Sequence, residues 1–253
     1  MNPEQRRTAI VTGAGSGIGE AVARRLSADG LAVVLAGRRE QLLREVAGSI
    51  EQAGGAALAV PADLALADEP ARLVQAALAE FGRLDVLVNN AAVIRTHPIS
   101  EYPLDEFDWH VAVNIRAPYF LIKAAIPALR AAANASVVNI SSSSGTIVRP
   151  EQSVYGMTKA ALEYLTRSLA AELAGDRIRV NCIAPGPVDT PIHETWAPSR
   201  EAAHEWLMPQ IPLKRMGLSE EIATWVARLC DDDAGWITGA ILRIDGGQAL
   251  DFQ

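Results

Sequence analysis

The sequence predicts an α/β protein: a doubly wound sheet of about seven parallel strands with helices on both faces. Short aliphatic or β-branched runs alternate along the chain with longer helical stretches, a pattern typical of strand–helix–strand units. Several of the short runs are apolar throughout, as expected of strands whose two faces are both covered by helices. A glycine-rich stretch follows the first of these runs, where a strand would turn into a helix.

The predicted strands are residues 9–12, 32–36, 57–60, 86–89, 136–140, 178–183 and 241–244. The first predicted helix, residues 20–28, presents Ala21, Val22 and Leu26 as an apolar stripe. No composition shift, linker, low-complexity tract or internal repeat interrupts the chain, so we expect residues 1–253 to form a single domain. Residues 187–212 break the rhythm with five prolines and two tryptophans, which predicts a substrate-lid insert near 188–213.

Composition narrows the classes of function. Hydrophobic residues make up 49% of the chain, as expected of a globular protein with a core. The net charge is −7, so neither a nucleic-acid backbone nor an anionic membrane surface is an expected partner. Cys182 and Cys230 are too few for a disulfide framework and lack metal-ligand spacing, so no metal site is predicted. The first residues show no apolar region of a signal peptide, and no uninterrupted apolar run approaches the roughly 18 residues that a membrane span needs. We therefore expect a cytoplasmic protein.

The glycine turn after the first strand predicts a pyrophosphate site. Residues 12–19 read T-G-x-x-x-G-x-G, and glycines there allow a tight turn that lets an anion approach the free N–H groups of the new helix. The standard G-x-G-x-x-G pattern is not met, because counting from Gly13 its last position is Ile18. The alternative is a tight turn without a ligand.

The end of the second predicted strand bears on the choice of cofactor. An acidic residue there would bind the adenine-ribose 2′-hydroxyl of NAD, but the position is Gly37. Arg38 and Arg39 follow and offer guanidinium groups to a 2′-phosphate. We therefore expect NADP, with NAD as the alternative cofactor if the two arginines are only solvated.

Tyr155 and Lys159 are a candidate proton-transfer pair. Their spacing places a phenol and an ammonium one turn apart on the same helix face. A phenol has an ordinary pKa near 10, and we expect the ammonium and a cationic nicotinamide to lower the pKa of Tyr155.

Tyr119 and Lys123 repeat the same spacing and are a decoy for this pattern. Thirteen residues before Tyr155 stands Ser142, at the end of a predicted buried strand, whereas the residue thirteen before Tyr119 is Glu106. Only the first pair therefore has a hydroxyl at the carboxyl edge of the sheet, where ligands of open α/β sheets bind.

With these residues, the sequence resembles the short-chain dehydrogenase/reductase family, in its compact subtype of roughly 250 residues, over essentially the whole chain. The motifs occur in the family's order: Thr12-Gly13-x-x-x-Gly17-x-Gly19, Asp63-Leu64, Asn89-Asn90-Ala91-Ala92, Val113-Asn114, Ser142 with Tyr155 and Lys159, Pro185-Gly186-Pro187-Val188-Asp189-Thr190, and Asp245-Gly246-Gly247. One departure is Ala92, which stands where the family usually has glycine.

The resemblance implies a Rossmann-type fold and a role for each matching residue. Tyr155 would be the general acid-base, Ser142 would hold the substrate oxygen, and Lys159 would bind the nicotinamide ribose and lower the tyrosine pKa. Asn114 would anchor a proton-relay water. The predicted cofactor contacts are Gly13, Ser16, Gly17, Ile18, Gly19, Arg38, Arg39, Asp63, Leu64, Asn90, Ala91, Tyr155, Lys159, Pro185, Gly186, Val188 and Thr190. The family also implies a homo-oligomer, often a homotetramer, with a dimer as the other form.

Pro118 gives Asn114 independent physical support. A proline cannot donate to the carbonyl four residues earlier and pushes it aside, and that carbonyl belongs to Asn114. A released carbonyl facing a polar cleft is a natural water site. The alternative is a proline kink that serves packing alone.

The predicted function is the interconversion of a ketone and a secondary alcohol by hydride transfer, as an NADPH-dependent ketoreductase acting on a small molecule. One alternative is a catalytically silent nucleotide-binding regulatory protein on the same fold. A sugar-nucleotide epimerase or dehydratase would need a larger C-terminal domain than the roughly 60 residues after Thr190.

The substrate pocket is predicted to be mainly apolar. Its expected apolar walls are Ile94, Ile147, Val148, Trp196, Trp206, Leu207 and Met208. Arg95, Arg149, His97 and His193 are candidates to recognise a carboxylate or hydroxyl, with solvated rim positions as the alternative.

Overall fold

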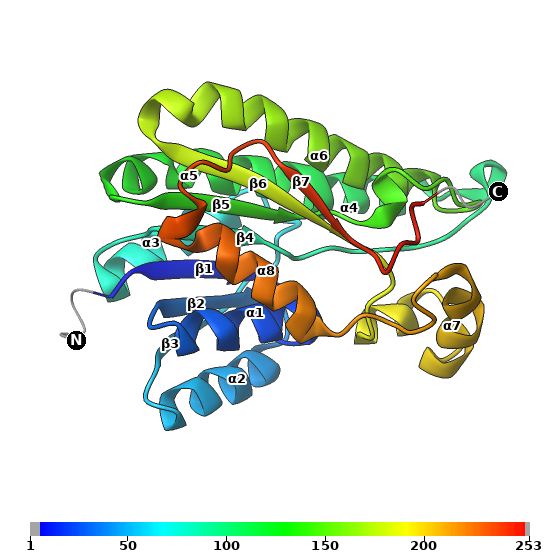
Figure 1. Ribbon diagram of the computed structural model, residues 1–253, viewed down its shortest axis with the longest axis horizontal. Coiled ribbons are helices and arrows are strands. Elements are labelled where there is room, and N and C mark those ends of the chain that lie inside the picture. The colour runs from blue at the N-terminus through cyan, green and yellow to red at the C-terminus, as the bar shows by residue number, and fades with distance from the viewer. Residues whose placement is uncertain (1–5, 251–253) are drawn as a thin grey trace.

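Seven parallel strands form one sheet in the computed structural model, which describes residues 6–250 (Figure 1). The strand order is β3-β2-β1-β4-β5-β6-β7. The strands are β1 (Thr8–Thr12), β2 (Ala32–Gly37), β3 (Ala56–Pro61), β4 (Val86–Asn89), β5 (Ala135–Ile140), β6 (Ile178–Pro185) and β7 (Ile241–Ile244). Each of the seven predicted runs lies within one of them, so the predicted doubly wound sheet is confirmed.

Helices cover both faces of the sheet because successive strand residues point to opposite sides and both sets are apolar. Val11 and Val33 belong to one hydrophobic core, which α1, α2 and α8 close; Ile10 and Val34 belong to the other, which α3, α5 and α6 close. The α-helices are α1 (Gly17–Ala28), α2 (Glu40–Gln52), α3 (Glu69–Phe81), α4 (Leu104–Val111), α5 (Ala117–Ala131), α6 (Ser153–Leu173), α7 (Arg200–Leu207) and α8 (Ser219–Cys230).

A π-helical turn, η3 (Ala112–Arg116), joins α4 to α5. Pro118 cannot donate to the carbonyl of Asn114, so the regular helical pattern cannot continue through this point. The backbone widens instead, and the Ala117 N–H bonds to the Ala112 carbonyl, five residues back. The backbone disturbance predicted at Asn114 is therefore present.

The chain reverses direction across the sheet between β1 and β4. From β1 it builds outward through β2 and β3, and it then returns to place β4 on the other side of β1. Such a reversal leaves a crevice beyond the carboxyl ends of the strands, because the connections on its two sides run apart.

Residues beyond β6 cover this carboxyl edge. The segment 188–213, predicted as a lid insert, contains η6 (Pro191–Thr195), α7 and η7 (Met208–Gln210), and α7 stands apart from the sheet (Figure 1). It has a small core of its own around Ala203, Leu207 and Ile211.

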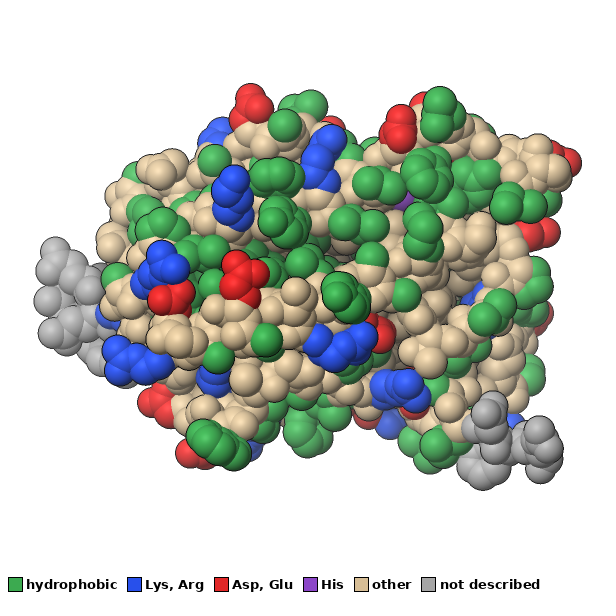
Figure 2. All heavy atoms as spheres, turned by 90° about the horizontal axis from the view of Figure 1, so that it is seen from above, with side chains coloured by type: hydrophobic (Ala, Val, Ile, Leu, Met, Phe, Trp, Pro, Cys, Tyr) green, Lys and Arg blue, Asp and Glu red, His purple; other side chains and the backbone are tan. Residues whose placement is uncertain are grey.

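On the face seen from above, basic and acidic side chains interleave with apolar ones (Figure 2). Cys182 and Cys230 are both buried and unpaired. Within residues 6–250, no helix has the length and apolar character that crossing a membrane requires.

Candidate active site

A cavity of about 440 Å³ lies at the carboxyl edge of the sheet. Segments that follow six of the strands, β1 to β6, contribute to its wall. The predicted site residues that line it are Gly13, Ser16, Gly17, Ile18, Arg38, Arg39, Asp63, Leu64, Asn90, Ala91, Ser142, Tyr155, Lys159, Pro185, Gly186, Val188 and Thr190. Gly19 and Asn114 were also predicted, but they do not line it.

The turn between β1 and α1 requires its glycines for two different reasons. Gly13 and Gly17 have φ angles of +68° and +56°, a backbone region that residues other than glycine rarely adopt. At Gly19 the reason is space, since a Cβ atom would lie 2.2 Å from the Gly13 carbonyl oxygen. Gly19 therefore lets the helix pack onto the turn, and the free N–H groups of the first helical turn remain available for an anion.

Gly19→Ala should destabilise the protein by about 1 to 3 kcal/mol, because the methyl group meets backbone that cannot move aside cheaply. The matched control is Gly48→Ala in α2, where a Cβ atom meets nothing within 4 Å. The control should be neutral or should stabilise the helix by up to about 1 kcal/mol. Urea unfolding of both variants checks this, and equal stabilities would contradict the packing role of Gly19.

Asn90 fastens the glycine turn to the end of β4. Its Nδ2 donates to the Thr12 carbonyl at 2.8 Å, while the backbone N–H groups of Asn90 and Ala91 both donate to Thr12 Oγ1 at 3.0 Å. These bonds fix the two strand ends on either side of the crevice.

Ser142, Tyr155 and Lys159 meet in the same cavity wall. Ser142 follows β5, and its Oγ accepts a hydrogen bond from the Ser144 N–H at 3.1 Å. Tyr155 lies in the first turn of α6, and Lys159 one turn later donates from Nζ to the Ile140 carbonyl at 2.9 Å. The Lys159 Nζ is 5.6 Å from the centre of the Tyr155 ring.

The decoy pair lies elsewhere. The Tyr119 side chain is 46% exposed on α5, against 7% for Tyr155, and neither Tyr119 nor Lys123 lines the cavity. The Lys123 ammonium lies over the Phe120 ring instead. The hydroxyl thirteen residues upstream therefore separates the pair inside the cavity from the pair outside it.

Burial dominates the ionisation of both groups. It raises the pKa of Tyr155 to about 12, with the Ser142 hydroxyl acting in the opposite direction. It also lowers the pKa of Lys159 to about 8. Without a nicotinamide beside it, Tyr155 has a raised pKa, because removing the phenolate from water outweighs the Ser142 hydrogen bond. At neutral pH the phenol is therefore protonated and the ammonium is largely charged. The lowering expected from the ammonium and a cationic nicotinamide together stays a prediction.

The lowered pKa of Lys159 predicts a pH-dependent contribution to stability in the cofactor-free protein. Below about pH 8 the ammonium is protonated in both states, so folding bears the full cost of burying the charge. Between about pH 8 and the ordinary value of 10.5, the folded state has released the proton and the unfolded state still holds it, so this cost shrinks as the pH rises.

Wild type should therefore gain stability relative to Lys159→Met above pH 8, by at most about 1.4 kcal/mol per pH unit. Comparing the two proteins cancels the other groups that titrate in this range. Urea unfolding at several pH values between 7 and 9.5 measures the difference. A difference that does not change with pH would show that the buried ammonium is not the group responsible.

The Asn114 side chain forms hydrogen bonds that join two segments of the fold. Its Oδ1 accepts from the Val93 N–H and its Nδ2 donates to the Val93 carbonyl, both at 2.9 Å. Nδ2 also donates to Thr158 Oγ1 on α6 at 3.1 Å. Asn114 is buried and holds the loop after β4 against α6, next to Tyr155. The predicted water on its backbone carbonyl stays a prediction.

Two arginines stand at the end of the cavity beside the glycine turn. Arg39 donates from Nη2 to Ser16 Oγ at 2.6 Å, and the Arg38 guanidinium lies 5.6 Å from the centre of the Trp109 ring. Neither forms an ion pair with a carboxylate in the described part of the chain. Both positive charges therefore remain available to an anionic ligand.

The opposite end of the cavity is lined by several of the predicted apolar residues, but not all. Ile94, Trp196, Trp206 and Leu207 contribute to its wall. Ile147, Val148 and Met208 do not, and Val148 is 93% exposed. Gln152 also lines the cavity and was not predicted; its position three residues before Tyr155, at the start of the same helix, was the available signal.

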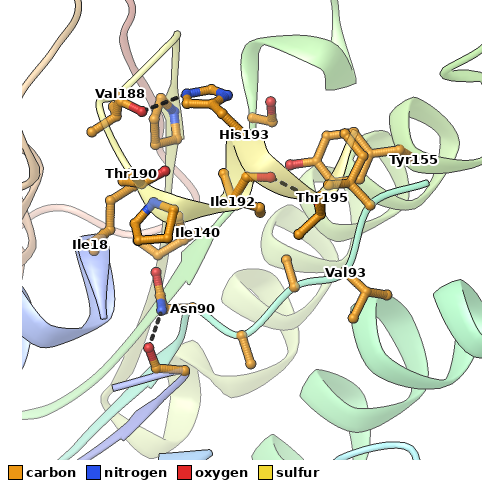
Figure 3. A pocket seen from close by; sticks show the side chains of 18 of the residues that line it. Ile18, Asn90, Val93, Ile140, Tyr155, Val188, Thr190, Ile192, His193 and Thr195 are labelled. Atoms are coloured by element: carbon orange, nitrogen blue, oxygen red, sulfur yellow. Dashed lines mark hydrogen bonds between the residues drawn. The ribbon is translucent and has the colours of Figure 1, made fainter. Parts of the chain in front are cut away.

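Of the four polar candidates for this end, Arg149 and His193 line the cavity, whereas Arg95 and His97 do not. His193 is buried, and its Nε2 lies 2.8 Å from the Val188 carbonyl (Figure 3). A carbonyl only accepts, so Nε2 carries the hydrogen and Nδ1 is an acceptor. Within residues 6–250, Nδ1 has no partner. Burial lowers the pKa of His193, so the ring is neutral at pH 7.

Asp189 holds α7 against the end of β6. Its Oδ1 accepts from Arg200 Nε at 2.6 Å and lies 2.9 Å from His204 Nε2. Trp196 and Trp206 pack edge to face at 5.8 Å between ring centres. These contacts hold the segment that lines the end of the cavity opposite the glycine turn.

Comparison with known proteins agrees with this architecture. A family model described as enoyl-(acyl carrier protein) reductase matches residues 13–249. An uncharacterised oxidoreductase of Thermotoga maritima is 36% identical over 246 residues, or 96% of this chain and 97% of the relative. The solved short-chain dehydrogenase/reductase of Serratia marcescens is 36% identical with a TM-score of 0.90, covering 98% of this chain and 100% of that one. A 3-ketoacyl-(acyl-carrier-protein) reductase of Brucella melitensis, solved in complex with NADH, is 33% identical with a TM-score of 0.89, covering 96% and 98%.

Proposed function

The chain belongs to the short-chain dehydrogenase/reductase family and is an oxidoreductase, and on that premise we propose that it reduces a ketone to a secondary alcohol with NADPH. The observation that carries the proposal is the meeting of Ser142, Tyr155 and Lys159 in one wall of the cavity. A catalytically silent nucleotide-binding protein has no physical need for this proton-transfer set.

The cavity suits a dinucleotide at its glycine-turn end. Positive φ angles at Gly13 and Gly17 bring the backbone close to where a pyrophosphate would lie. Arg38 and Arg39 would hold a 2′-phosphate, with no carboxylate at Gly37 to repel it. NAD is the alternative cofactor, since the Brucella reductase was solved with NADH.

In the proposed reaction, the carbon of the substrate carbonyl receives a hydride and its oxygen receives a proton. When bound, the reduced nicotinamide supplies the hydride for the carbonyl carbon. Ser142 Oγ already accepts from Ser144, which leaves its own O–H proton free to be donated to the carbonyl oxygen. Tyr155 then gives its phenolic proton to the oxygen, on which negative charge develops as the carbon is reduced.

The ionisation of Tyr155 and Lys159 fits this direction of reaction. A pKa of about 12 keeps the phenol of Tyr155 protonated and ready to act as an acid at neutral pH. The Lys159 ammonium, 5.6 Å from the centre of the phenol ring, stabilises the phenolate left behind. One of its hydrogens is used by the Ile140 carbonyl, and the other two remain for the cofactor ribose.

The direct test is a screen of ketones and secondary alcohols with NADPH and with NADH, followed through the absorbance of the reduced cofactor. Thermal shifts with each cofactor run beside it. We expect stabilisation by NADPH and turnover of at least one ketone class. Binding of neither cofactor, or cofactor binding without turnover of any ketone or alcohol, would contradict the proposal.

A further inference from the structure

The cavity wall carries more positive charge than the proposed cofactor explains. Its charged side chains are four cations, Arg38, Arg39, Arg149 and Lys159, and one carboxylate, Asp63. The whole chain has a net charge of −7, so this local excess runs against the composition. Arg38 and Arg39 stand at the glycine turn and Lys159 beside Tyr155, which leaves Arg149 as the cation without a role.

Arg149 is held in a defined position at the substrate end. Its guanidinium lies 5.3 Å from the centre of the Trp206 ring, and its Nη1 donates to Gln210 Oε1 at 2.8 Å. Gln210 is itself oriented, because its Nε2 donates to the Trp206 carbonyl at 2.9 Å. Stacking and hydrogen bonding together fix the plane of the guanidinium, so little entropy is lost when it binds a ligand.

The remaining edge of this guanidinium is unused. Nε and Nη2 make no side-chain hydrogen bond within residues 6–250, and no carboxylate of that part of the chain lies within ion-pair distance of Arg149. Burial lowers the pKa of Arg149, yet an arginine remains protonated at neutral pH. A partly desolvated positive charge without a counter-ion gains strongly from an anion.

We propose that Arg149 binds a carboxylate of the substrate, so that the proposed ketone is a keto acid whose carboxylate lies at the Trp206 end of the cavity. The Nε and Nη2 donors form a planar fork that matches the two oxygens of a carboxylate. The inference rests on the proposed ketone reduction. It adds that Arg149 bridges the loop after β5, which carries Ser142, and the segment 188–213, which carries Trp206 and Gln210.

The test compares unbranched keto acids, from levulinate upward, with their methyl esters. The measured quantity is the ratio of kcat/KM for each acid to that for its ester. We expect wild type to favour the acid, and Arg149→Met to reduce the ratio by about 10- to 100-fold, as expected for the loss of a charge-assisted pair. Arg149→Lys should retain part of the preference, because it keeps the charge without the fork.

Arg95→Met is the matched control. Arg95 also stacks on a tryptophan, 5.3 Å from the centre of the Trp109 ring, but it does not line the cavity. Its substitution should leave the acid-to-ester ratio unchanged. An equal fall of the ratio in both variants would mean that loss of any nearby positive charge lowers it, and would overturn the role of Arg149.

A binding measurement separates this inference from the proposed function. Levulinate should quench the tryptophan fluorescence of the NADP⁺ complex in wild type and in Arg95→Met, and much less in Arg149→Met, because Trp206 stacks on the bound guanidinium. If no ketone is reduced but this pattern holds, the proposed reaction fails and the carboxylate site stands. If esters are reduced as well as acids and Arg149→Met changes neither the ratio nor the quenching, the carboxylate site fails and the reaction stands.

Discussion

Tyr155→Phe should lower kcat by about 100-fold or more, the loss expected when a positioned general acid is removed. The variant keeps the buried ring and removes only the phenolic oxygen, whose pKa burial raises to about 12. Because the ring still packs beside Lys159, the dissociation constant of NADPH should change little. Steady-state kinetics and a cofactor titration on the same preparation measure both quantities.

Tyr119→Phe is the matched control, since Tyr119 and Lys123 reproduce the spacing of Tyr155 and Lys159 on another helix. Tyr119 is 46% exposed and does not line the cavity. Its kcat should stay within a few-fold of wild type. Near-normal turnover in Tyr155→Phe, or a large loss in Tyr119→Phe, would overturn the assignment of the proton donor.

Gly37→Asp should shift cofactor preference from NADPH towards NADH by about 10- to 100-fold in the ratio of dissociation constants. The new carboxylate would repel a 2′-phosphate and would accept from a free ribose hydroxyl. The site has room for it, because a Cβ atom on Gly37 would approach nothing closer than Leu43 Cδ2, at 3.6 Å. Arg38 and Arg39 remain in place, so the variant isolates the effect of the added acid.

Gly48→Asp controls for the added charge, since Gly48 lies on α2, has open space around it and does not line the cavity. Its dissociation constants for both cofactors should match those of wild type. A wild type that already prefers NADH would show that Arg38 and Arg39 do not select NADPH.

Local patterns in the sequence were enough to predict the sheet and the glycine turn. Apolar runs with helices between them define parallel strands. The inner strands β1, β2, β4, β5 and β6 are buried almost throughout, and the edge strands β3 and β7 are only partly buried but keep the same aliphatic character. The hydroxyl of Ser142 at the end of a strand also distinguished the pair in the cavity from its decoy, since the carboxyl ends of parallel strands share one edge.

Contacts between segments far apart in the chain escaped prediction. Val148 and Met208 have apolar side chains of suitable size, yet both are exposed and neither lines the cavity. Burial of Tyr155, which raises its pKa to about 12 in the cofactor-free protein, was not predicted, because depth of burial depends on the whole fold and not on the spacing to Lys159. The anchoring of Arg149 by Gln210 and Trp206 likewise joins residues about 60 positions apart.

The central claim is that this cavity reduces a ketone by joining a hydride from NADPH to a proton from Tyr155. Its most direct test is the mass of the alcohol formed from a reduced ketone and NADPH carrying deuterium at the transferred position. The account predicts one deuterium on the carbinol carbon in wild type and in Tyr119→Phe, with product formation lost in Tyr155→Phe. An unlabelled alcohol, or labelled product formed at an undiminished rate by Tyr155→Phe, would contradict it.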